Sequence, residues 1–147
     1  MSKILTTELE LFNLFLYLSY KYKVTNFYLN KLNRSKWSMY VQSIKNRNKF
    51  VISYYLPFLL NKSFNNVTRV ILHEFGHIKF TANTSIEREK LAEQYMLEIV
   101  KKDYPKLYQE AIEESKYFLN NKKWAKKFPK HYKAFSQIKD YQRKENL

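Results

Sequence analysis

The stretch that decides the fold is Val70-Ile-Leu-His-Glu-Phe-Gly-His-Ile-Lys-Phe80, which contains the pattern H-E-x-x-H. Its apolar residues predict a buried helix over residues 67–80. His73 and His77 are four residues apart, so they project from the same face of that helix. Glu74 is displaced from His73 by about 100° around the helix axis. The pattern therefore predicts two imidazoles side by side with a carboxylate next to them.

This arrangement is typical of a zinc site. Neutral imidazole is a good zinc ligand, and two imidazoles on one face can reach the same ion. His73 and His77 are therefore predicted metal ligands. Glu74 would lie beside the ion, where it can act as the catalytic base and accept a proton from a water molecule activated by zinc. Gly76 is the only glycine in the chain, and glycine inside a helix costs about 1 kcal/mol relative to alanine, which predicts that another element approaches closely there.

A catalytic zinc site needs a third protein ligand and one open position. Thr84-Ser-Ile-Glu87 is a capping-box pattern that predicts the start of a second helix, over residues 85–102. Glu89 lies at the edge of the apolar face of this helix and is the predicted third ligand. Glu93 follows four residues later on the same side, and we expect it to accept the outer N–H of a ligating histidine.

These residues resemble the zincin peptidases that use a glutamate as third ligand. His-Glu-Phe-Gly-His at 73–77 is similar to their H-E-x-G-H helix, and Glu89-Lys-Leu-Ala-Glu-Gln-Tyr95 is similar to the E-x-x-A-[D/N]-x-[F/L] pattern of their third-ligand helix. The closest resemblance is to the ImmA/IrrE-like metallopeptidases. It implies that Glu89 binds zinc, and that a strand such as Lys49–Leu56 lines the substrate cleft as an edge strand. It covers roughly residues 49–100, and Glu93 departs from the usual Asp or Asn.

The rest of the chain predicts a mainly helical α+β protein. Two runs, 36–43 and 49–56, favour strands, and the polar stretch Lys45–Asn48 between them favours a hairpin turn. We therefore expect a small antiparallel sheet packed on the two ligand-bearing helices, as in a minimal zincin-like domain. Asn65 or Asn66 is the expected cap of the helix over 67–80. Further helices are predicted over residues 6–20 with Thr6 or Thr7 as cap, from about 103–105 to 119, over 122–128 and over 131–143.

Length and composition limit the classes of protein to which the chain can belong. The chain has 147 residues, of which 45% are hydrophobic and 18% aromatic, and it has no cysteine. This favours a single folded domain over residues 1–147, with a basic helical part over 103–147, in a reducing cytoplasm. The longest apolar stretch, Leu11–Leu18, is far shorter than the roughly 20 residues of a membrane span. We therefore expect no stable membrane insertion, although a shallow contact with a membrane remains an alternative.

The net charge of +14 is uneven along the chain. Residues 1–66 carry ten basic and two acidic side chains, residues 101–147 carry thirteen and six, and residues 67–100 carry four and five. Lys122, Lys123, Lys126 and Lys127 lie among aromatic residues, which favours weak binding of nucleic acid without sequence preference. Codon bias in an AT-rich genome would explain the same lysines without any partner.

The sequence therefore predicts a zinc-dependent metalloendopeptidase that hydrolyses peptide bonds of an intracellular protein. The substrate backbone would pair with an edge strand near Phe50–Tyr54. His131 and Tyr132 are weak candidates for the group that stabilises the oxyanion. Three alternatives stay open: a zinc-containing binding module that contacts nucleic acid or a partner protein without cleaving it, a protease held on DNA by its basic flanks, and a membrane-surface peptidase that uses the helix over residues 9–20.

Overall fold

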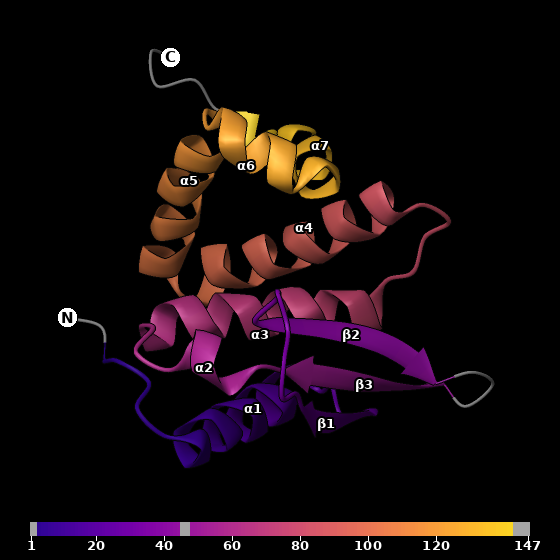
Figure 1. Ribbon diagram of the computed structural model, residues 1–147, viewed down its shortest axis with the longest axis vertical. Helices are drawn as coiled ribbons and strands as arrows, with labels where there is room; N and C mark the ends of the chain where they lie inside the picture. Colours follow the sequence, from indigo (N-terminus) through magenta and orange to yellow (C-terminus); the bar gives the residue numbers. More distant parts are fainter. Residues whose placement is uncertain (1–2, 45–47, 143–147) are drawn as a thin grey trace. The chain divides into compact units, whose positions relative to one another are not determined.

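The computed structural model describes residues 3–44 and 48–142, which form a mainly helical α+β protein with one small sheet (Figure 1). The chain divides into two compact units, Met1–Lys79 and Phe80–Leu147. The first unit contains helices α1, α2 and α3 and the sheet, and the described part of the second, residues 80–142, contains α-helices and a 3-10 turn. The mainly helical α+β class is confirmed, and the assignment of residues 1–147 to a single domain stays a prediction.

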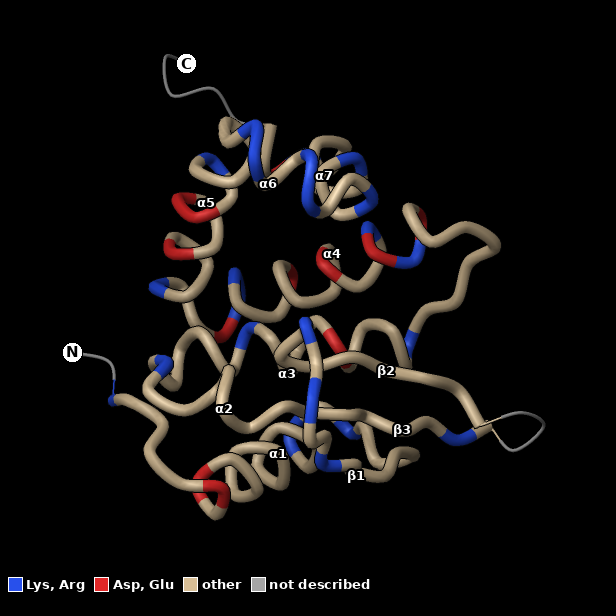
Figure 2. Tube along the Cα trace, viewed as in Figure 1, with Lys and Arg blue, Asp and Glu red and all other residues tan. Residues whose placement is uncertain are grey.

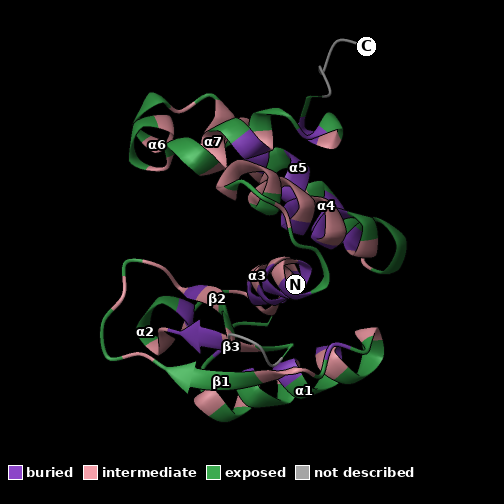
Figure 3. Ribbon diagram, turned by 90° about the vertical axis from the view of Figure 1, so that its right-hand side faces the viewer, coloured by how far each residue is buried: buried purple, intermediate pink, exposed green. Residues whose placement is uncertain are grey.

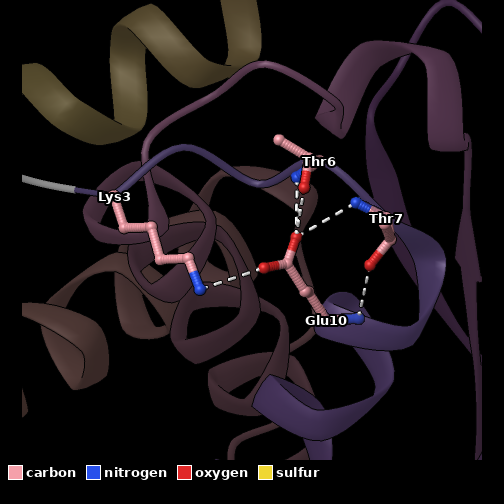
Figure 4. Close-up of polar contacts among 4 residues, drawn as sticks. All are labelled: Lys3, Thr6, Thr7 and Glu10. Atoms are coloured by element: carbon pink, nitrogen blue, oxygen red, sulfur yellow. Dashed lines mark hydrogen bonds and ion pairs between the residues drawn. The ribbon is translucent and has the colours of Figure 1, made fainter.

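Helix α1 spans Glu8–Tyr22 and begins at a complete capping box (Figure 4). The Thr7 hydroxyl accepts the Glu10 N–H at 3.1 Å, and the Glu10 carboxylate accepts the Thr7 N–H at 3.1 Å. These two bonds satisfy backbone donors that have no partner inside the helix. Thr7 is thus the cap, one of the two residues predicted, and Lys23 ends the helix in the left-handed conformation, with φ of 56°.

The sheet contains three strands, β1 (Phe27–Lys31), β2 (Met39–Ile44) and β3 (Lys49–Tyr54), in the order β1-β3-β2. Strands β2 and β3 are antiparallel, as predicted for the hairpin. The turn itself, predicted at Lys45–Asn48, lies outside the described residues except for Asn48, whose φ is 49°.

Two expectations about the sheet are wrong. The sheet is mixed rather than antiparallel, because β1 pairs with β3 in parallel. Strand β3, which contains Phe50–Tyr54, is the central strand and not an edge. Its backbone groups are already used on both sides, so no substrate can add to it. Strand β1 could not be predicted from the sequence. Four of its five residues are exposed, so buried and exposed residues do not alternate along it.

A polar contact ties α1 to the sheet. The Tyr54 hydroxyl on β3 donates to the Glu8 carboxylate at 2.8 Å, and Lys31 at the end of β1 lies 3.3 Å from the same oxygen. Burial, together with the neighbouring Glu8 carboxylate, raises the pKa of Tyr54 to about 12. The hydroxyl therefore stays protonated and remains a donor at neutral pH.

Helix α3 spans Phe64–Lys79 and follows a short helix, α2 (Leu56–Leu59). It begins three residues earlier than predicted, and the expected caps Asn65 and Asn66 lie inside it. The Ser63 hydroxyl instead accepts the Asn66 N–H at 3.0 Å. The aromatic rings of Phe15, Phe27 and Phe75 contact one another and join α1, β1 and α3 into one core.

The second unit comprises α4 (Ser85–Asp103), α5 (Pro105–Leu119), α6 (Lys122–Lys127), α7 (Pro129–Ser136) and a 3-10 turn at Lys139–Gln142. Thr84 caps α4 by accepting the Glu87 N–H at 3.1 Å, as predicted. The prediction of a last helix over 131–143 is wrong. Pro129 lies in the first turn of α7, where proline is tolerated, and the helix ends at Ser136. Ile138 and Tyr141, both buried, anchor the 3-10 turn that follows.

The capping box predicts a specific dependence of stability on pH. Hydrogen bonds from Thr6 and Thr7 and the contact with Lys3 lower the pKa of Glu10 from its ordinary value of 4.5 to about 2, the Thr6 backbone N–H being the largest cause. A lowered pKa contributes stability above about pH 4.5, and that contribution is lost as the pH falls toward about 2. Urea unfolding at pH 6 and pH 3 should show a smaller loss of stability for Glu10→Gln than for the wild type.

The matched control is Glu98→Gln, an exposed glutamate on α4. This variant should keep the wild-type slope of stability against pH over the same interval. Equal slopes for Glu10→Gln and the wild type would show that the capping carboxylate is not responsible.

Candidate metal centre

The H-E-x-x-H residues lie on α3, whose neighbouring turns form the core of the first unit. Ile71, Leu72 and Phe75 are fully buried. His73 and His77 are partly exposed, and their ring centroids lie 5.0 Å apart with the planes inclined by 74°. The structure therefore confirms that the two imidazoles are neighbours on one face, as their spacing of four residues requires.

Glu74 is buried, with only 8% of its surface exposed. Burial of a charged carboxylate costs free energy unless another group pairs with it or donates a hydrogen bond to it. Its neighbours on α3 are Phe75 and Gly76, which are also buried. Gly76, the only glycine of the chain, thus lies at a buried helical position, where it takes up less volume than a residue with a side chain would.

Glu89 lies on α4 and is partly buried. Its Oε2 lies 3.2 Å from Nε2 of His131 on α7. His131 in turn contacts the rings of Phe128 and Phe135 on edge, which hold its imidazole in place. From the sequence, His131 is a candidate only for stabilising the oxyanion. Its contact with Glu89 could not be predicted, because the two residues are 42 positions apart and no local pattern links α4 with α7.

His73, His77 and Glu89 form a group that could hold a metal ion. Each offers one ligand atom, and these atoms all lie within 4.8 Å of one another. Ligands of a tetrahedral zinc ion, at bond lengths of about 2.0–2.2 Å, are separated by roughly 3.4 Å. The donors are thus grouped more loosely than around a bound zinc ion. Two imidazoles and a carboxylate are a donor set that suits zinc among other metals.

Glu93 lies one turn beyond Glu89 on α4 and is 7% exposed. Its Oε2 accepts a hydrogen bond from the Tyr141 hydroxyl, which is buried in the 3-10 turn after α7. The predicted role of Glu93 as acceptor of a histidine N–H stays a prediction. The nearby Tyr95 has a raised pKa because burial disfavours its charged form, and its ring contacts Phe80.

The lysines proposed for nucleic-acid binding are exposed on α6, and Figure 2 shows further basic positions on α7. Trp124, which lies among them, is partly buried and contacts four aromatic rings, those of Phe118, Phe128, Tyr132 and Phe135. A ring engaged in this way is not presented for stacking on bases. The prediction for Lys122, Lys123, Lys126 and Lys127 therefore rests on their charge alone.

Comparisons with protein-family models, with curated proteins and with solved structures find no match to this chain. The residues and their geometry are therefore the basis for any functional assignment.

The hydrogen bond between Tyr141 and Glu93 should stabilise the second unit. Tyr141→Phe removes a donor to a buried carboxylate, so we expect unfolding in urea to show a loss of about 1–3 kcal/mol. Tyr117→Phe, at an exposed position on α5, is the matched control and should change the stability little. Equal stability of the two variants would contradict a structural role for this bond.

Proposed function

We propose that this chain is a zinc-dependent peptidase of the zincin type, with His73, His77 and Glu89 as metal ligands. The observation that carries the proposal is the convergence of these three ligand atoms beside the buried Glu74. Two imidazoles and one carboxylate are the ligand set of a catalytic zinc site, which keeps a fourth position for water. The resemblance to ImmA/IrrE-like metallopeptidases and the zincin-like packing of sheet and helices belong to the same proposal.

Glu74 is the general base in this proposal. It neighbours a ligand but is turned about 100° away from it around the helix. From that position its carboxylate accepts a proton from the attacking water and then donates it to the leaving amine. Zinc, when bound, polarises the substrate carbonyl and lowers the pKa of its water toward about 7. The burial of Glu74 excludes bulk water, which would otherwise compete for the same proton.

His131 is the positioning residue for Glu89. Its Nε2 lies 3.2 Å from Oε2 of Glu89, so the contact restricts how the carboxylate can rotate. Partners of this kind orient the ligands of a metal and raise its affinity. Phe128 and Phe135 fix the imidazole in turn. This role gives His131 a function at the site that differs from oxyanion stabilisation.

Strand β2 is the edge on which a substrate backbone would add. The Tyr55 N–H donates to the Ser38 carbonyl at 2.9 Å, and Met39 is opposite Tyr54. Backbone groups alternate in direction along an antiparallel strand. Tyr40 and Gln42 therefore share the direction of Ser38, toward β3. The N–H and C=O groups that point to the outer edge of the sheet belong to Met39, Val41 and Ser43.

An added peptide strand would pair with those outward groups and gain main-chain hydrogen bonds without regard to its side chains. In the first unit, β2 also packs against α3, the helix that carries Glu74 and the two histidines. A backbone held along β2 is therefore held beside α3. This assignment replaces β3, whose place at the centre of the sheet excludes it.

The metal prediction concerns stoichiometry and affinity. Purified protein should contain about one zinc per chain, and His73→Ala or His77→Ala should abolish binding because one imidazole and one carboxylate are too few ligands. Glu89→Ala should weaken retention strongly. His131→Gln should raise the dissociation constant for zinc by about 10- to 100-fold, the usual effect of losing an outer-shell partner. Metal content by mass spectrometry and competition with a chromophoric chelator measure both quantities.

Glu98→Ala, at an exposed glutamate on the same helix, is the control and should bind zinc like the wild type. Full zinc retention in Glu89→Ala combined with its loss in Glu93→Ala would overturn the choice of third ligand.

The prediction for the base separates catalysis from metal binding. Glu74→Gln should fold and hold zinc but lose peptide hydrolysis, since an amide does not accept the proton. We expect turnover to fall by at least about 100-fold. The assay incubates zinc-loaded protein with a mixed peptide library and identifies new termini by mass spectrometry. Unchanged turnover in Glu74→Gln would rule out this mechanism, and a wild type that holds zinc but cleaves nothing would indicate the non-proteolytic binding module.

A further inference from the structure

Helix α1 is apolar on both of its faces. The buried face carries Leu11, Phe15 and Leu18, which pack into the first unit. At 100° per residue, Leu9, Leu16 and Tyr20 fall within about 40° of one another on the opposite side. A surface helix of a water-soluble domain normally carries polar residues there. The outward face of α1 therefore breaks the usual pattern.

The side chains of this outward face are strongly exposed. The exposed fraction is 66% for Leu9, 70% for Leu16 and 86% for Tyr20. Phe12 and Tyr17 flank them and are exposed as well. Figure 3 shows exposed positions along α1 in green. We call these five residues the outer α1 face. Single exposed hydrophobic residues are normal, whereas five on one side of a helix favour a binding surface.

The charges beside the C-terminal part of this surface are positive. A shallow hollow along α1 is lined by Asn13, Leu16, Tyr17, Tyr20, Lys21 and Lys23, and contains no acidic side chain. The two acidic residues of the helix, Glu8 and Glu10, are engaged by Tyr54 and Lys31 and by Lys3, Thr6 and Thr7 respectively. Residues 1–79 carry twelve Lys and Arg against three Asp and Glu.

We propose that the outer α1 face binds the surface of an anionic lipid bilayer. The helix would lie in the interface plane with Leu9, Phe12 and Leu16 among the upper acyl chains, about 5–10 Å deep. Tyr17 and Tyr20 suit the boundary, because tyrosine has an apolar ring and a polar hydroxyl. Lys21 and Lys23 would meet the lipid phosphates. Within the described residues no helix is long and apolar enough to cross a membrane, so the contact is peripheral.

The positive charge near the outer α1 face favours a lipid surface over a second copy of the chain as its binding partner. A dimer built on this face would bring together two copies of a unit with twelve Lys and Arg against three Asp and Glu, whichever way the two helices run. Like charges placed together oppose association. An anionic bilayer supplies the opposite charge over a wide area, and each lysine near such a surface contributes favourably. The combination of an apolar row and a basic border therefore fits lipid best.

The test is cosedimentation with vesicles at low salt. Wild-type protein should bind vesicles of phosphatidylcholine and phosphatidylglycerol and bind phosphatidylcholine alone much more weakly. Leu16→Gln combined with Tyr20→Gln should reduce the binding by at least about tenfold, because two anchors are removed from the interface. Tyr117→Gln, at a comparably exposed tyrosine on α5, is the apolar control and should bind like the wild type.

Two double variants test whether the lysines at the end of α1 provide the electrostatic attraction to anionic vesicles. Lys21→Gln with Lys23→Asn should weaken binding to anionic vesicles, and asparagine tolerates the left-handed conformation of position 23. Lys122→Gln with Lys123→Gln on α6 removes the same charge elsewhere and should leave the binding nearly intact. Equal losses for the two pairs would show general attraction by net charge and would contradict the assignment to α1.

A direct measurement avoids dependence on the folding of these variants. The chain has no cysteine, so Asn13→Cys, in the hollow beside the outer α1 face, accepts a single environment-sensitive dye. Its emission should shift to the blue with anionic vesicles, whereas a dye at Glu113→Cys on α5 should not respond. No binding of the wild type would overturn the proposal. So would a wild-type dimer in sedimentation that Leu16→Gln with Tyr20→Gln converts to monomer, because a second copy would then occupy the face.

Discussion

The structure depends on one constraint: a single helix, α3, must supply both the core of the first unit and the polar side chains of the candidate site. Ile71, Leu72 and Phe75 are completely buried, while His73 and His77 stay partly exposed on another side of the same turns. Because these residues share one backbone, the core fixes the angle at which the imidazoles project. The energy that buries α3 therefore also positions the two proposed metal ligands on it, which is the preorganisation that the proposed catalytic site would need.

Because α3 carries the candidate site, the strand packed against α3 has a role in the proposed function. Strand β3 is central and takes hydrogen bonds from both neighbours, so its role is to hold the other strands. Strand β2 packs against α3 and presents the backbone groups of Met39, Val41 and Ser43 to the outer edge. A substrate bound as an additional strand would thus be aligned by the element that lies beside the ligand helix. In the proposed mechanism, β2 would hold the peptide and α3 would hold Glu74, so each would be positioned by a regular secondary-structure element.

Local chemistry could be predicted from the sequence, and contacts distant in the chain could not. The spacing of His73 and His77 and the caps at Thr7 and Thr84 follow from short-range rules, and the structure confirms them. Strand β1 was missed because its side chains are mostly exposed and its pairing with β3 is parallel and non-local. The partners of Glu89 and Glu93 on α4 could not be predicted for a similar reason. His131 contacts Glu89 and Tyr141 donates to Glu93 across 42 and 48 residues, and no periodicity encodes such distances.

The central claim is that one zinc ion joins His73, His77 and Glu89. The most direct measurement is a crystal structure of the zinc-loaded protein with anomalous diffraction recorded on both sides of the zinc absorption edge. The account predicts one strong anomalous peak per chain, about 2.0–2.2 Å from one nitrogen of each histidine and from the Glu89 carboxylate. A peak bound to the two histidines and a different third residue, or no peak at these histidines in protein that contains zinc, would contradict it.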